Sequence, residues 1–107
     1  MTSVNFLADK KLFGFEISGH SSFNGDDEVG KIVCAAVSSA AYMTANTITE
    51  IIGDTAEIQV SEAKMFLKVS NPSDMSVKLL EGLKLHLTEL SNEYSNNIKI
   101  YGGAEKC

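Results

Sequence analysis

The sequence has no tryptophan, a single proline, and only two cysteines and two histidines among its 107 residues. These few potential metal ligands do not occur at the spacings of zinc sites, so a metal site is not expected. The cysteines, Cys34 and Cys107, are weak grounds for a disulfide, because a cytoplasmic setting keeps thiols reduced. Nothing in the composition indicates a cofactor.

Clustered positive charge is also missing. Nine Lys and Arg residues against fourteen Asp and Glu residues give a net charge of −5, and the basic residues form no patch along the sequence. Nucleic-acid binding is not expected, since it needs a basic footprint that displaces counterions from phosphates. An acidic protein is compatible with a basic peptide as its partner.

A signal peptide and a membrane span are not expected either. The first twenty residues contain no uninterrupted apolar run. Residues 32–52 have the length of a membrane span, but they include polar side chains such as Ser38, Thr44, Asn46 and Glu50. We therefore interpret this segment as the core helix of a soluble, cytoplasmic protein.

Alternating and helical patterns predict one α+β domain over residues 1–107, in the order ββαββαβ, with two helices on a mainly antiparallel sheet. The predicted strands cover 4–8, 12–18, 56–61, 65–70 and 98–101, and the predicted helices begin near residue 30 and after Pro72. A Ser or Asn beside Pro72 is expected to cap the second helix. Residues 102–107 are expected to form a loose C-terminal tail.

The first helix is predicted to begin at Gly30 or Lys31 and to end at Ile52, where Gly53 is suited to a C-terminal cap. This helix is apolar nearly all round, which predicts burial on more than one side, and its small residues permit close approach of a sheet, a helix or another subunit. The expected buried stripe consists of Val33, Val37, Ala40, Ile48 and Ile51.

The stretch from Gly19 to Ser39 holds the residues best placed for chemistry. Cys34 is predicted near the start of the first helix, where free N–H groups and the helix dipole favour a thiolate, the nucleophilic form of cysteine. His20 ends a strand, and the loop that follows allows it to fold back as a general base. A buried, inert cysteine and a surface histidine are the alternatives.

Two further groups are weaker candidates. Ser38 lies one helical turn beyond Cys34 and either donates to the site or bonds back to the preceding turn. Asp26, Asp27 or Glu28 could orient the imidazole, or form only a solvated acidic loop.

The Gly19-His20 pair and the IVCAAVS string at residues 32–38 resemble the ribosomal-processing cysteine protease family of bacteria. The resemblance extends to chain length and element order. It implies an endopeptidase that forms a homodimer and removes the N-terminal extension of large-subunit ribosomal protein twenty-seven. By this resemblance Cys34 is the nucleophile and His20 the base, and Gly19 and Ser38 match positions around the site.

The sequence departs from the family pattern beside both catalytic positions. Ser21 stands where Ala is common, and Lys31 stands where the family often has Asp, three residues before the cysteine. An acidic residue that orients the His20 imidazole would then come from residues 26–28 or be absent. Lys31 could instead favour the thiolate of Cys34.

The leading hypothesis is thus a cysteine endopeptidase acting in ribosome biogenesis, with backbone N–H groups near the helix start holding the oxyanion. A non-catalytic ribosome-assembly or peptide-binding module is the alternative. A third interpretation, in which the first helix serves only as a dimer interface, predicts that Cys34 is buried.

Overall fold

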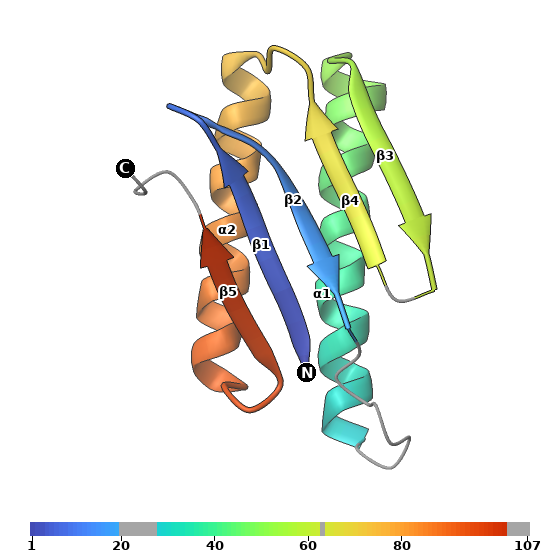
Figure 1. Cartoon of the computed structure of the whole chain (residues 1–107), viewed down its shortest axis with the longest axis vertical. Helices are drawn as coiled ribbons and strands as arrows, with labels where there is room; N and C mark the ends of the chain where they lie inside the picture. The colour runs from blue at the N-terminus through green and yellow to red at the C-terminus, as the bar shows by residue number, and fades with distance from the viewer. Residues whose placement is uncertain (20–27, 63, 103–107) are drawn as a thin grey trace.

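The computed structural model describes residues 1–19, 28–62 and 64–102. The chain forms five strands and two long helices in the predicted ββαββαβ order (Figure 1). The elements are β1 (Thr2–Ala8), β2 (Leu12–Ser18), α1 (Glu28–Asn46), η1 (Thr47–Ile52), β3 (Ala56–Ser61), β4 (Lys64–Val69), α2 (Asp74–Glu93) and β5 (Ile98–Gly102). β5 includes Gly102, so the strand takes up the first residue of the predicted tail.

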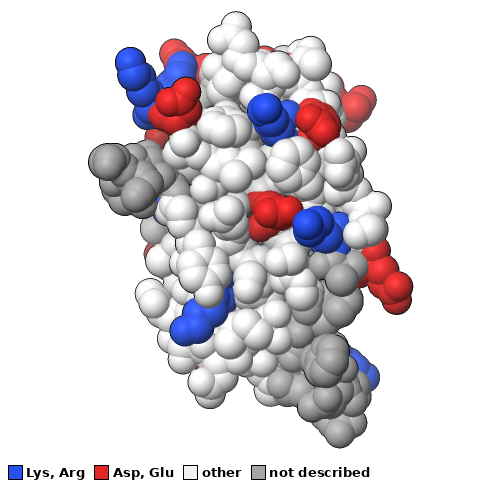
Figure 2. All heavy atoms as spheres, viewed as in Figure 1, with Lys and Arg blue, Asp and Glu red and all other residues white. Residues whose placement is uncertain are grey.

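The sheet order is β3-β4-β2-β1-β5, which the sequence patterns alone could not supply. Only the pairing of β1 with β5 is parallel, and the other three pairings are antiparallel. Both helices lie on one side of the sheet, as Figure 1 shows, so the other side faces outward. That outward face is largely uncharged and carries a few scattered Lys, Asp and Glu side chains (Figure 2). An ion pair of 3.0 Å between Lys64 and Glu16 joins β4 to β2 on it.

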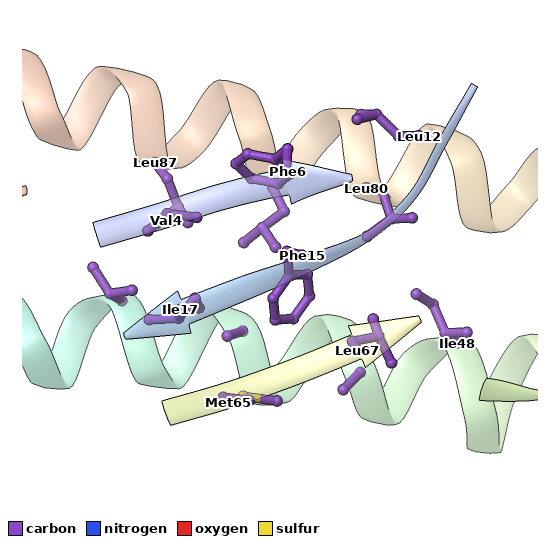
Figure 3. Close-up of a cluster of buried hydrophobic side chains, with 14 of the residues drawn as sticks. Val4, Phe6, Leu12, Phe15, Ile17, Ile48, Met65, Leu67, Leu80 and Leu87 are labelled. Carbon is purple, nitrogen blue, oxygen red and sulfur yellow. The ribbon is translucent and has the colours of Figure 1, made fainter. Parts of the chain in front are cut away.

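The core lies between the helices and the sheet's inner face. Phe6 of β1 and Phe15 of β2 stand opposite each other, with their rings in an edge-to-face contact at 6.5 Å (Figure 3). Leu80 and Leu87 of α2 are fully buried in the same cluster, as the helical spacing of the leucines predicts. Burial of each such side chain contributes about 1.5–3 kcal/mol, which makes this layer the main source of stability.

The first helix begins at Glu28, earlier than the predicted Gly30 or Lys31. After Asn46 it widens into the π-helical turn η1 and ends at Gly53, whose left-handed φ of 90° confirms the predicted cap. The wider turn changes which side chains face the core. Ile48 is buried, whereas Ile51 is 79% exposed, so the predicted place of Ile51 in the buried stripe is wrong.

The first helix lies on the sheet and also packs against α2. Its outer side is open in the single chain, where Ile32 and Met43 are 63% and 57% exposed. The Glu28–Ile52 segment is long and apolar enough to cross a membrane, a property that the core helix of a globular protein shares. Here it lies along the sheet.

Asp54 joins the end of the first helix to the start of the second. Its carboxylate accepts hydrogen bonds from the Ser73 backbone N–H, the Ser73 hydroxyl and the Ser76 hydroxyl, at 2.9, 2.8 and 2.6 Å. Ser73 is the N-cap of α2, as expected for a Ser beside Pro72. These hydrogen bonds lower the pKa of Asp54, with the Ser76 hydroxyl contributing most.

We expect this junction to make stability depend on pH. Because the pKa of Asp54 is lower in the folded chain than its usual value of about 3.9 in an unfolded one, its stabilising effect is complete above about pH 4. The effect is lost as the pH falls through the folded-state pKa. Asp54→Asn should therefore lower the melting temperature at pH 7 and reduce its decline below pH 4, as measured by circular dichroism. An unchanged pH profile would contradict this role, and Asp74→Asn, at an exposed carboxylate nearby, is the matched control.

Candidate active site

Cys34 lies in the N-terminal half of α1. Its thiol is free and half-buried. Because α1 begins at Glu28, Cys34 lies in the second turn rather than the expected first one. The N–H groups without an intrahelical partner therefore precede it, and the helix dipole acts on it from farther away.

A pocket of about 120 Å³ opens beside this thiol. Its walls come from α1, from the beginning of β1, from the end of β2 and from the region where β3 and β4 meet. The lining residues are Thr2, Ile17, Gly19, Cys34, Val37, Ser38, Tyr42, Val60, Ser61, Glu62, Lys64 and Met65. Buried Ile17, Val37 and Met65 make the inner wall apolar, and polar side chains surround the opening.

The helix contributes three side chains at intervals of four residues. Cys34, Ser38 and Tyr42 share one flank of α1, and all three line the pocket. Tyr42 was missed in the sequence analysis, although its spacing from Cys34 and Ser38 is a signal that could have identified it.

The end of β2 brings Gly19 to the same pocket. Gly19 has a φ of 86°, and a Cβ atom at this position would collide with the carbonyl oxygen of Met1. Only glycine permits this close approach of the backbone at position 19 to the backbone of Met1 without strain. Gly19 therefore lies at the same pocket as the candidate nucleophile, and its part in the site stays a prediction.

The region where β3 and β4 meet supplies a wall that sequence reasoning did not find. Val60, Ser61, Glu62, Lys64 and Met65 lie more than twenty positions after Cys34. No spacing rule connects them with the cysteine, because the strand order determines their proximity. Glu62 gives the opening an acidic group that the sequence analysis did not consider.

The other predicted site residues are not brought together by the described structure. Lys31 and Glu28 are exposed on α1 and do not line the pocket. His20, Asp26, Asp27 and Cys107 lie outside the described residues. The Cys34–His20 pair and its acidic orienter therefore stay predictions.

The arrangement suits a nucleophile that must be reached by a chain segment. In the single chain the thiol is neither sealed in the core nor fully exposed. No cluster of three metal-ligating side chains occurs in the part of the chain that the structure describes.

Comparisons with known structures agree with this fold. The ribosomal processing protease Prp from Staphylococcus aureus, in complex with a covalently linked product peptide, superimposes with a TM-score of 0.84 at 20% identity, over 95% of this chain and 99% of that one. The same protein in complex with a substrate peptide gives a TM-score of 0.84 at 19% identity, with the same shares of both chains. SMU.848 from Streptococcus mutans gives 0.85 at 22% identity, over 96% of this chain and 94% of that one.

No curated protein sequence matches this chain. The family model for the cysteine protease Prp, however, matches residues 1–99, which include nearly all of the described elements. This chain therefore belongs to the Prp family of cysteine proteases.

Proposed function

We propose that this protease removes the N-terminal extension of large-subunit ribosomal protein twenty-seven in the cytoplasm, using Cys34 as nucleophile and His20 as base. The observation that carries the proposal is the accessible, half-buried thiol of Cys34 in a pocket that Gly19 also lines. His20 is the residue that follows Gly19 in the sequence. A ribosomal processing role is supported by the S. aureus protein of the same fold, which has been captured with substrate and product peptides.

The proposed chemistry is acyl transfer through a thioester. His20 accepts the proton of the Cys34 thiol, and the sulfur bonds to the carbon of the scissile carbonyl. His20 then donates this proton to the leaving amine as the C–N bond breaks. Water hydrolyses the thioester, which releases the extension with a new carboxyl terminus and regenerates the thiol.

Stabilisation of the oxyanion requires donors near the sulfur. The backbone N–H groups of the helix start were the first expectation, but Cys34 lies beyond them in the second turn of α1. Within the described pocket, the hydroxyl of Ser38 lies one turn from Cys34 and is the donor that we assign to this task.

The chain's net charge of −5 suits a basic ribosomal peptide. Membership in a protease family favours catalysis over the alternative of a non-catalytic assembly or peptide-binding module. No cofactor and no nucleic acid takes part in the proposed reaction.

We also propose that the protein works as a homodimer through the outer side of its helix layer. Val29, Ile32 and Met43 share an exposed flank of α1, and Met75 of α2 is exposed as well. Met43 also lines an apolar groove of about 240 Å³ between the two helices. A second copy would cover these side chains and complete the burial that the sequence of α1 predicts.

The cleavage reaction is tested by mass spectrometry of the ribosomal protein precursor from the same organism. We expect a single N-terminal truncation with the unmodified protein. Cys34→Ala should abolish it, and His20→Ala should slow it by about 10²–10⁴-fold, the usual contribution of a general base. Lys84→Ala, on α2 away from the pocket, is the control. If the Cys34→Ala protein cleaves as fast as the unmodified one, the assigned nucleophile is wrong.

The dimer is tested by sedimentation equilibrium. Burial of an unpaired charge in the dimer interface costs free energy. Met43→Glu is therefore expected to shift the protein from dimer to monomer. Asn92→Glu adds the same charge at an exposed position near the end of α2 and should leave the dimer intact. A monomer for the unmodified protein at every concentration would rule out this assembly.

A further inference from the structure

The outer edge of β3 is open. β3 is the last strand of the sheet order, and within the described residues it pairs only with β4 (Figure 1). Such an edge carries a row of backbone donors and acceptors that can pair with another extended chain.

The direction of these backbone groups follows from the register. Ser70 donates its N–H to the Thr55 carbonyl at 2.9 Å, so Thr55 and Ser70 form a hydrogen-bonded pair just before β3 begins. Antiparallel pairs alternate between bonded and non-bonded, and the register from Ala56 to Ser61 is unbroken. The N–H and C=O groups of Ile58 and Val60 therefore point away from β4.

The side chains of these two residues are apolar and exposed. Ile58 stands opposite Leu67, and Val60 stands opposite Met65, so both project to the helix side of the sheet. They nevertheless remain 41% and 52% exposed, whereas Leu67 and Met65 are buried. Edge strands usually carry charged residues or proline against unwanted pairing, and this edge has neither at its outward-bonding positions.

This edge leads directly to the thiol. Val60, Ser61 and Glu62, at the end of β3, line the same pocket as Cys34. A strand laid beside β3 would therefore end next to residues that line the Cys34 pocket.

We propose that the substrate binds as a sixth strand along the outer edge of β3. This inference rests on the proposed function and specifies its substrate class, which is an extended peptide with apolar side chains at alternate positions before the scissile bond. Those side chains would pack on Ile58 and Val60, and the peptide backbone would bond to the outward N–H and C=O groups of the same two residues.

The continuity of the edge with the Cys34 pocket favours the substrate over a second copy of this chain. Pairing of two β3 strands would also bring Glu57 and Glu62 of both acidic chains to one edge, where like charges repel each other. A basic or neutral peptide meets no such repulsion.

The test uses Cys34→Ala protein, which binds without turnover, and a fluorescein-labelled decapeptide covering the cleavage site of the ribosomal protein. Its backbone nitrogens are methylated one at a time, and binding is measured by fluorescence anisotropy. We expect affinity to fall about tenfold at every second position before the scissile bond, since each methyl group there removes one strand hydrogen bond and adds a steric clash. Methylation at the positions between them should change little.

A second variant acts on the protein side. Ile58→Pro removes an outward N–H without removing a bond to β4 and should weaken binding about tenfold, whereas Ile58→Val keeps the N–H and should restore it. Circular dichroism establishes that each variant is folded, and the methylation series decides the question if Ile58→Pro is not.

The outcomes separate this inference from the proposed function. Normal cleavage and binding with no alternation in the methylation series would overturn the added strand and leave the protease assignment intact. If the ribosomal peptide is neither bound nor cleaved, the proposed function fails, and the same series on an octapeptide with valine at alternate positions decides the inference. A dimer that dissociates in Ile58→Pro would overturn it in favour of a second copy.

Discussion

The packing of α1 against the sheet determines the direction in which Cys34 points. Val33 and Val37 are both 1% exposed and hold the helix in one rotation about its axis. Cys34 follows Val33 by about 100° around that axis and is therefore carried to the boundary between core and solvent. A different rotation would bury the thiol or turn it away from the pocket, so core packing and chemistry are set by the same contacts.

The remaining walls of the site depend on this arrangement as well. The inner wall is made by Ile17 and Met65, which belong to the core, while the opening is made by residues at strand ends. Rigid apolar contacts therefore support the residues at the strand ends that form the opening. This division is common in enzymes, where a packed scaffold positions residues on connecting segments.

Local patterns in the sequence were sufficient to predict the elements and two parts of the site. Alternation and helical spacing identified the strands and both helices of the described residues, and the structure places Gly19 and Ser38 at the pocket that Cys34 lines. What failed depended on tertiary structure. The β3–β4 wall requires the strand order, the exposure of Ile51 follows from a π-helical turn, and the Asp54 junction joins residues about twenty positions apart.

The parallel pairing of β1 with β5 has a consequence for the synthesis of the protein. Thr2 donates its backbone N–H to the Asn97 carbonyl at 2.8 Å, stands beside Ile98 in the sheet and lines the Cys34 pocket. During translation, β1 emerges first and must wait for β5, because contacts so distant in sequence form only when both segments are available. The pocket wall is therefore completed only after β5 has left the ribosome, so a chain synthesised no further than α2 would hold Cys34 in an unfinished pocket.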